Sequence, residues 1–512
     1  MRQFLLSICL LALVSCQSSR TALNTTQQNI EFTILQINDV YEISPLEGGK
    51  AGGLARAATV KKQLLAENPN TIAVLAGDFL SPSFIGTLKD EAGERIAGMQ
   101  MVETLNAMGL DYATFGNHEF DLSDPAVLQK RIDASQFEYT TCNALRINGD
   151  KKEPFTQKIN GVDRPIPSYL IREFSNGKGQ SLKVGFIGVV LPFARQDYLH
   201  YEDVTESFRS TYNEVKDKAD IVVGITHLDV VEDRQLAADV PGVALFIGGH
   251  DHTEMNHYVE RTVITKADAN AKTAYIHRFT YNPPSKMVQI QSSVKKIDDS
   301  IADEPSTQKV VDKWQSKVDQ LMSEMGFDPN RKVLQLSQPL ICKEALVRTQ
   351  PTNYGQLTAL AMSAAIPGAD VYLLNSGSMR LDDNLSNVVT EYDVLRTFPF
   401  GGSIVKMQIP GIRLQQLLDT GLKTNIGDGG YLQQIRAVAS SGGYLISGKE
   451  LEKEKMYTIV LPQFLAKGRE QNLEFLGEYT FQETAELDMY DSKVTNDIRN
   501  IVIAYFKQLK QY

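Results

Sequence analysis

The sequence predicts an α/β protein built from two α/β domains, and three features of the 512-residue chain support this. In the first half, short runs rich in β-branched residues each end in polar or glycine residues, and helical segments separate them. A charged, amphipathic stretch begins near residue 298, and a second alternation of helix and strand begins at Leu340. Apolar runs of this kind are typical of parallel strands buried within a sheet.

The first residues of the chain resemble a secretion signal. A positive start at Met1 and Arg2 precedes an apolar run from Phe4 to Val14, which is the usual order in such signals. The segment 13–16 reads Leu-Val-Ser-Cys and resembles a bacterial lipobox, in which cleavage before the cysteine leaves a thiol that carries lipid. An ordinary signal with a chance cysteine is the alternative.

These features predict a lipoprotein signal at 1–15 and a lipidated tether at 16–29, attached through Cys16. The tether is rich in Ser, Thr and Gln, as flexible linkers are. We therefore expect an extracytoplasmic bacterial lipoprotein, periplasmic or at the cell surface, anchored to the outer membrane. No later stretch has the roughly 18 consecutive apolar residues of a membrane-spanning helix.

Composition excludes some partners and some kinds of metal site. A net charge of −10 argues against a nucleic-acid polymer as partner, because that polyanion is bound through clustered Lys and Arg. Small phosphate esters are not excluded, since only the local charge matters to them. After the tether the only cysteines are Cys142 and Cys342, too few for a disulfide framework or a thiolate site. Any metal must therefore bind through nitrogen and oxygen.

Five apolar runs of the first half are each followed, or ended, by residues that can bind metal. The predicted strands are 32–37, 71–76, 112–115, 221–225 and 243–247, with predicted helices at 53–67 and 98–108. Ligating or catalytic side chains follow them: Asp39, Asp78, Asn117, His118, His227, His250 and His252. Because sites in such folds form at the carboxyl ends of strands, these side chains are expected to converge.

The residue types suit the hydrolysis of a phosphate ester. Two metal ions about 3.5–4 Å apart can clamp a phosphoryl group, neutralise it and activate water. Asp78 has two carboxylate oxygens and can serve both ions. Nitrogen and oxygen donors together suit zinc, manganese or iron. The sequence therefore predicts a site for two divalent metal ions whose identity it does not settle.

Several short segments together resemble the calcineurin-like metallophosphoesterases, and within them the two-domain 5′-nucleotidase family that includes bacterial UDP-sugar hydrolases. The matching segments are Gly-Asp at 77–78, Gly-Asn-His-Glu at 116–119, Thr-His at 226–227, Gly-His-Asp-His at 249–252 and Gly-Gly-Leu-Ala-Arg at 52–56. The resemblance implies a four-layer αββα metallophosphoesterase sandwich at 30–297, a linker helix at 298–339 and an α/β substrate-binding domain at 340–512.

The resemblance also assigns roles to the candidate residues. One ion would be bound by Asp39, Asp78 and His252, and the second by Asp78, Asn117, His227 and His250. His118 would not bind metal but would stabilise charge on the scissile phosphate and protonate the leaving oxygen. Asp121 would orient His118, as carboxylates do in other His-Asp pairs, and its alternative role is that of a helix N-cap.

One position departs from the family pattern, which reads Asp-x-His where this chain has Asp39, Val40 and Tyr41. A neutral phenol with a pKa near 10 is a poorer ligand than imidazole. Three outcomes are open: Tyr41 is a further metal ligand as phenolate, water or Glu42 fills its place, or the first site is weak and prefers another metal. We favour a working site with an altered metal preference, because every other ligand is present.

The stretch from 298 to 325 contains the only tryptophan, Trp314, and keeps apolar residues at helical spacing. It is interpreted as the linker helix between the domains. The alternative is a helix of the first domain, which would move the boundary.

The second domain supplies the candidate substrate residues. Its predicted helix at 353–365 and strand at 371–374 are followed by segments that resemble the family's substrate-binding domain. Arginines pair with phosphate, and aromatic faces stack on a flat base. By the resemblance, Arg348 and Arg380 would hold phosphate with Asn375 beside them, Tyr431 and Phe464 would enclose the base, and Glu470 would bind ribose. The family's Gly-Gly-Asp-Gly pattern is absent around Glu470, which leaves sugar recognition open.

We therefore expect a dinuclear-metal phosphohydrolase that removes the 5′-phosphate of extracytoplasmic nucleotides, acting as a monomer or dimer, with domain closure during turnover. Alternatives within the family are a 2′,3′-cyclic phosphodiesterase, a UDP-sugar hydrolase and the thiosulfate-handling branch. An alternative of another class is a lipoprotein that binds nucleotides without hydrolysing them, because Tyr41 replaces a ligand.

Overall fold

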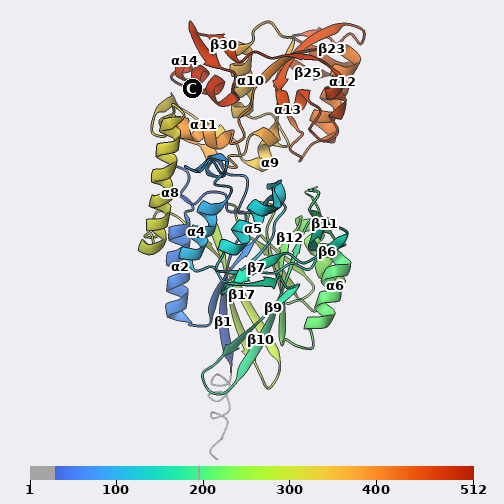
Figure 1. Cartoon of the computed structure of the whole chain (residues 1–512). Coiled ribbons are helices and arrows are strands. Elements are labelled where there is room, and N and C mark those ends of the chain that lie inside the picture. The colour runs from blue at the N-terminus through green and yellow to red at the C-terminus, as the bar shows by residue number, and fades with distance from the viewer. Residues whose placement is uncertain (1–28, 194–195) are drawn as a thin grey trace, which may run out of the picture.

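The computed structural model describes residues 29–193 and 196–512, which form two α/β domains placed one above the other (Figure 1). The predicted signal at 1–15, the lipidation site Cys16 and the tether at 16–29, except for its last residue, lie outside the described residues and stay predictions. Within the described ranges, no helix combines the length and the apolar character needed to cross a membrane.

The first domain contains two six-stranded sheets. The first has the order β17-β16-β1-β2-β3-β4, in which β1 to β4 are parallel and β16 and β17 are antiparallel to their neighbours. Its strands are β1 (Ile30–Ile37), β2 (Thr71–Ala76), β3 (Tyr112–Thr114), β4 (Glu138–Tyr139), β16 (Thr273–Asn282) and β17 (Met287–Lys296).

The second sheet has the order β14-β15-β13-β12-β10-β9, with β10, β12, β13 and β15 parallel. Its strands are β9 (Tyr169–Ser175), β10 (Ser181–Val190), β12 (Ile221–His227), β13 (Leu245–Gly248), β14 (Met255–Val259) and β15 (Thr262–Lys266). The sheets pack face to face through alternate side chains, such as Phe32 of β1, whose ring stacks on Phe174 at 4.5 Å. This apolar layer is the central core of the domain.

Helices cover the two outer faces, so the domain has the predicted four layers. The first sheet is covered by α2 (Leu54–Glu67), α4 (Met99–Met108) and α5 (Pro125–Ala134), and the second by α6 (Val204–Val215) and α7 (Val230–Asp239). Shorter elements complete the domain: α3 (Phe84–Thr87), η1 (His118–Asp121), β5 (Ala144–Asn148), β6 (Lys151–Glu153), β7 (Thr156–Ile159), β8 (Val162–Pro165) and β11 (Leu199–Tyr201).

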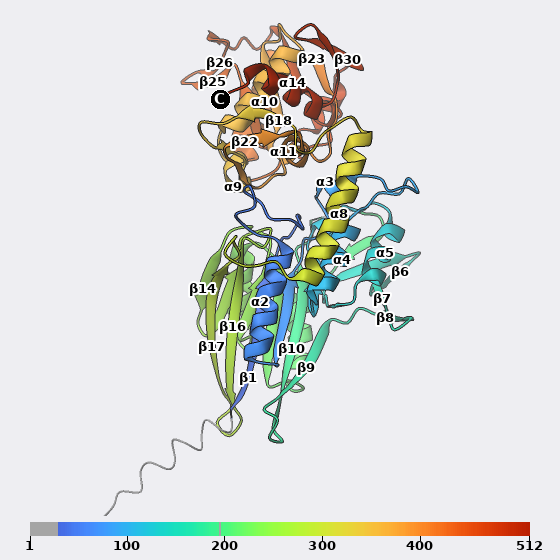
Figure 2. The same ribbon diagram turned by 90° about the vertical axis from the view of Figure 1, so that its left-hand side faces the viewer.

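Helix α8 (Pro305–Glu324) lies within the segment 298–339 that was predicted as a linker. It runs along α2 and α4 and reaches the second domain (Figure 2). Its buried face includes Val311, Val318 and Trp314, whose Nε1 donates a hydrogen bond of 2.9 Å to Glu103 of α4. Helix α8 therefore packs on the first domain over this face, and the boundary residues stay a prediction.

The second domain is built on a five-stranded sheet of order β24-β20-β28-β23-β29. Its strands are β20 (Val371–Asn375), β23 (Ile404–Pro410), β24 (Leu432–Ile435), β28 (Met456–Pro462) and β29 (Phe481–Gln482). The helices are α9 (Glu344–Val347), α10 (Asn353–Ala365), α11 (Glu391–Thr397), α12 (Gly411–Asp419), α13 (Gln463–Ala466) and α14 (Ile498–Leu509), with the short turns η2 (Ser376–Ser378), η3 (Thr420–Thr424) and η4 (Glu474–Glu478).

Small strand pairs surround this sheet: β18 (Lys332–Gln335) with β22 (Val388–Thr390), β19 (Leu340–Ile341) with β21 (Asn384–Leu385), and β30 (Glu486–Met489) with β31 (Ser492–Thr495). A further three-stranded sheet contains β25 (Ala437–Ser440), β26 (Gly443–Ile446) and β27 (Lys449–Glu450). The chain is thus the mixed α/β protein of two domains that the sequence predicts.

Candidate metal centre and substrate cavity

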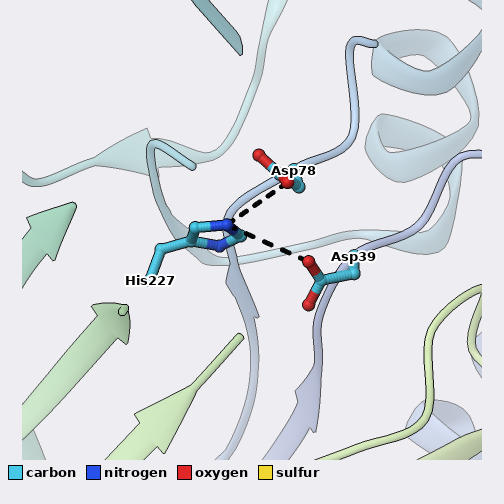
Figure 3. Close-up of side chains that lie close together, drawn as sticks. All are labelled: Asp39, Asp78 and His227. Atoms are coloured by element: carbon cyan, nitrogen blue, oxygen red, sulfur yellow. Dashed lines mark ion pairs between the residues drawn. The ribbon is translucent and has the colours of Figure 1, made fainter. Parts of the chain in front are cut away.

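The candidate ligands come together at the carboxyl ends of the parallel strands, as predicted. Asp39 follows β1, Asp78 follows β2, and His227 is the last residue of β12. Figure 3 shows these three side chains pointing toward one another, and one ligand atom from each lies within 4.8 Å of the others. All three are buried.

The remaining ligands surround this group. His227 Nε2 lies 3.2 Å from Asp78 Oδ2 and 4.0 Å from Asp39 Oδ1. Asn117 Oδ1 lies 3.1 Å from His227 Nε2 and 3.2 Å from His250 Nδ1. On the other side, His252 Nε2 lies 3.3 Å from Asp39 Oδ1. The structure therefore brings all six predicted ligands into one cluster.

The backbone is strained where it presents these ligands. Asp39, Asp78, His250 and His252 have φ values of 52°, 57°, 81° and 57°, a region that residues with a side chain rarely adopt. Conformations of this kind cost about 1–3 kcal/mol each and concentrate at functional sites. Close approach also restricts Gly116, because a Cβ there would lie 2.1 Å from Asp78 Oδ1.

Two buried residues that the sequence analysis did not select hold these loops. The carboxylate of Glu119 accepts hydrogen bonds from the backbone N–H groups of four residues, at positions 78, 79, 80 and 116. Burial, and then the charge of Asp78, raise the pKa of Glu119 to about 7 against the effect of these hydrogen bonds. Lys266 donates to the carbonyl oxygen of Gly249 at 2.8 Å and pairs with Asp251. In the sequence, Glu119 could be recognised only from its place in the segment 116–119, which resembles the family pattern.

The donor set fits divalent metal ions. Two carboxylates, three imidazoles and one amide oxygen converge, and zinc, manganese and iron bind such groups. Burial pushes the pKa of Asp39 and Asp78 upward, but the neighbouring histidines outweigh it and keep both pKa values below the ordinary range. Burial acts against protonation of His227, yet Asp78 raises its pKa to about 9, while burial lowers the pKa of His250 to about 4.

Tyr41 stands inside the cluster, at the position where the family pattern has histidine. Its hydroxyl donates a hydrogen bond of 3.0 Å to Asp78 Oδ2 and lies 3.0 Å from His252 Nε2. Burial, and then the charges of Asp78 and Asp39, raise the pKa of Tyr41 well above its ordinary value. Glu42 turns away and pairs with Arg396 of the second domain at 3.3 Å. Tyr41 is thus placed next to the ligands, whereas Glu42 already has a partner.

His118 lies beside this cluster and is oriented by Asp121. Its backbone N–H donates to Asp78 Oδ1 at 2.8 Å, and its Nδ1 lies 2.8 Å from Asp121 Oδ2. Burial lowers the pKa of His118, but Asp121 and Asp78 outweigh it and raise the pKa above the ordinary value. The N-cap of α5 is Asp124, so Asp121 does not have its alternative role as the cap of that helix.

A cavity of about 920 Å³ lies between the two domains and receives most of the predicted site residues. We call its two sides the first-domain wall and the second-domain wall. The first-domain wall includes Asp78, Asn117, His118, Asp121, His250 and His252. The second-domain wall includes Glu344, Arg348, Asn375, Arg380, Phe400, Phe464 and Glu470. The candidate metal ligands and the candidate substrate residues therefore face one another.

Polar groups on the second-domain wall form a connected set. Glu344, which the sequence analysis did not select, lies 2.8 Å from Arg348 Nη1 and 4.0 Å from Arg380 Nη1. Arg380 Nε is buried and has no hydrogen-bond partner within the described part of the chain. Asn375 Nδ2 donates to Glu470 Oε2 at 2.8 Å. Arg348 and Arg380 thus both lie near the carboxylate of Glu344, and Arg380 keeps an N–H group that can donate to a ligand.

The structure does not bring Tyr431 to the cavity. Its side chain is only 4% exposed and is not part of either wall, because it is buried at the start of β24. Phe464 lines the cavity as predicted and is 45% exposed, and Phe400 is a second exposed aromatic residue there, at 57%. The sequence analysis did not select Phe400, because its exposure depends on the tertiary fold.

Comparisons with known proteins match both domains. Residues 32–254 match the calcineurin-like phosphoesterase family model, and residues 332–477 match the model of the 5′-nucleotidase C-terminal domain. The chain is 24% identical to the trifunctional nucleotide phosphoesterase protein YfkN of Bacillus subtilis (strain 168), over 80% of this chain but only 29% of that protein. It is 23% identical to the snake venom 5′-nucleotidase of Naja atra, over 90% of this chain and 94% of that one.

A solved structure shows the same fold. The 5′-nucleotidase precursor from Thermus thermophilus superposes with a TM-score of 0.72 at 18% identity, covering 94% of this chain and 97% of the other. At this identity the likeness shows the fold of both domains and nothing further.

Proposed function

The chain belongs to the calcineurin-like phosphoesterases that carry a 5′-nucleotidase C-terminal domain, which are metal-dependent phosphoester hydrolases, and we propose that it removes the 5′-phosphate of nucleotides. The observation that supports this most directly is the cavity between the domains, where the metal ligands face two arginines and an exposed aromatic side chain. A nucleotide needs these features together, since its phosphate is anionic and its base is flat.

We assign the six ligands to two ions that share Asp78. The first would be held by Asp39, Asp78 and His252, and the second by Asp78, Asn117, His227 and His250. When bound, two such ions would supply positive charge beside the phosphoryl group and would acidify water in the site. Tyr41 donates to Asp78 as a neutral phenol, so the first ion would be held by fewer protein ligands and its metal preference would be altered.

The chain's own residues do the rest of the chemistry. His118, with its pKa raised and its ring fixed by Asp121, gives a proton to the leaving oxygen. Arg348 and Arg380 hold the phosphate from the second-domain wall, and Phe464 stacks on the base. Closure of the domains brings the two walls together and excludes water.

We also propose that the enzyme acts outside the cytoplasm as a lipoprotein, as the segment 1–16 predicts. The protein with lipid at Cys16 would label with radioactive palmitate, and the variant Cys16→Ser would not. Label in Cys16→Ser, or none in the wild type, contradicts the anchor and leaves the catalytic proposal untouched.

The catalytic proposal is tested with a panel of substrates. Purified protein is freed of metal, supplied with zinc, manganese, cobalt or iron, and given AMP, a 2′,3′-cyclic nucleotide or UDP-glucose. We expect inorganic phosphate from AMP at the highest rate. Faster cleavage of the cyclic nucleotide or UDP-glucose would reassign the substrate class, and no turnover of any ester would support a nucleotide-binding protein without catalysis.

A further inference from the structure

A carboxylate of the second domain contacts a candidate metal ligand of the first domain. Asp382 Oδ2 lies 3.0 Å from His252 Nδ1, and Asp382 Oδ1 accepts a hydrogen bond of 2.8 Å from the backbone N–H of Glu344. Both partners of the first contact are largely buried, with the side chains of Asp382 and His252 12% and 10% exposed. Solvent therefore screens this contact little. The contact crosses the domain interface next to the candidate metal ligands.

The direction of the His252 ring gives this contact its meaning. Nε2 is the nitrogen that faces the cluster, because it lies 3.3 Å from Asp39 Oδ1 and 3.0 Å from the hydroxyl of Tyr41. Nδ1 is left to donate its hydrogen to Asp382. Histidines that bind metal through one ring nitrogen usually donate the other N–H to a carboxylate or carbonyl, which fixes the tautomer and the orientation of the ring.

This chain depends on His252 more than a site with two imidazoles would. Tyr41 lies where the family pattern has an imidazole. His252 is therefore the one nitrogen donor assigned to the first ion, beside Asp39 and Asp78. If the ring of His252 turns or changes tautomer, the first site keeps only carboxylate oxygens. The orientation of this one ring then decides how tightly the first ion is bound.

The segment that carries Asp382 is itself held against the first domain. Asp382 has a φ of 45°, in the left-handed region that residues with a side chain rarely adopt. Lys272 of the first domain donates to the carbonyl oxygen of Asp382 at 3.2 Å. The backbone is thus fixed by one contact while the carboxylate is directed by another.

We propose that Asp382 is a positioning residue that acts across the domain interface. One of its oxygens keeps His252 in the tautomer that binds the first ion, and the other fixes the start of α9, next to Arg348. This inference rests on the two-ion centre of the proposed function. The contact between Asp382 and His252 contributes both to binding of the first ion and to the placement of one domain on the other. Binding of the first ion and this arrangement of the domains therefore stabilise each other.

Metal binding by the full-length protein tests this proposal. The variants are Asp382→Ala, which removes both contacts, and Asp382→Asn, whose single amide oxygen can accept from His252 or from Glu344 but not from both. Lys272→Met is the matched control, because it removes a contact with the same segment and leaves His252 alone. Zinc is titrated into each metal-free protein against a chromophoric chelator, and bound zinc per chain is measured after dialysis.

We expect two zinc ions per chain in the wild type and in Lys272→Met. Asp382→Ala should bind one of the two ions about 10–100-fold more weakly and the other as before, and Asp382→Asn should weaken the same ion by no more than Asp382→Ala does. Melting temperatures of the metal-free variants, measured alongside, separate this site-specific loss from general destabilisation. Two ions bound with wild-type affinity in both Asp382 variants would overturn the inference, as would equal weakening in Lys272→Met. Failure of the wild type itself to bind zinc overturns both the inference and the proposed two-ion centre, whereas zinc binding without hydrolysis overturns the proposed function alone.

Discussion

The first-domain wall and the second-domain wall of the cavity differ in what holds their side chains. On the first, the candidate metal ligands lie just beyond parallel strands, and Asp78 and Asn117 are buried. On the second, Phe400 and Phe464 are about half exposed, and Arg348 lies at the end of a helix of one turn. The difference indicates that the first-domain wall is formed before substrate binds, whereas side chains of the second-domain wall can adapt to the substrate.

The largest expected effect concerns the residue on which both ions depend. In Asp78→Asn, a shared carboxylate is replaced by an amide with one oxygen donor, and we expect loss of both metals and a fall in kcat of about 10⁴-fold or more. Elemental analysis and AMP hydrolysis measure the two. Asp220→Asn, a change of the same kind at the far end of the second sheet, is the control. Retention of two ions in Asp78→Asn would show that the first-domain wall is not organised around this residue.

Replacing His118 is expected to separate catalysis from metal binding. His118 donates its hydrogen bond to Asp78 from its backbone N–H, so His118→Ala keeps that bond and should keep both ions. Loss of the proton donor should lower kcat by about 10²–10⁴-fold. Asp121→Asn should lower it less, because the imidazole remains. Unchanged rates in His118→Ala would remove this residue from the mechanism.

Tyr41, which lies beside Asp78 and His252, offers a gain of function. In Tyr41→His an imidazole replaces the phenol between Asp78 and His252, and zinc at the first site should bind about tenfold or more tightly. Competition with a chelator measures this affinity. Tyr41→Phe serves as the companion variant: if it binds as much metal as the wild type, the hydroxyl is no ligand, and if it loses one ion, the phenol was binding it.

The smallest expected effects are on the second-domain wall. Stacking of a base on an aromatic side chain contributes about 1–3 kcal/mol, so Phe464→Ala should raise KM for AMP roughly tenfold with little change in kcat. Phe400→Ala tests the second exposed ring in the same assay. Tyr431→Leu, which removes the aromatic face and keeps an apolar side chain, should leave KM unchanged. A rise in KM as large as that of Phe464→Ala, at an unchanged melting temperature, would mean that Tyr431 turns into the cavity when substrate binds.

The same contrast explains what could be predicted from the sequence. Ligands such as Asp39 and Asp78 follow apolar strands, and the topology of parallel strands brings their carboxyl ends together whatever else the chain does. Glu119 was visible only as part of a motif, since its role is to bind backbone N–H groups that lie elsewhere in the chain.

Residues of the interface could not be found in this way. Glu344, Phe400 and Asp382 matter because of how the second domain is placed on the first, and no periodicity in the sequence encodes that placement. Tyr431 was assigned to the base by the resemblance alone, and in this structure packing at the start of β24 buries its ring.

Release of phosphate is expected to require both ions of the proposed metal centre. Metal-free protein is titrated with zinc or manganese while bound ions and phosphate released from AMP are measured in the same samples. We predict that hydrolysis stays near zero until both ions are bound and then rises to its maximum. Full activity without metal, or two bound ions with no phosphate released, would contradict the account.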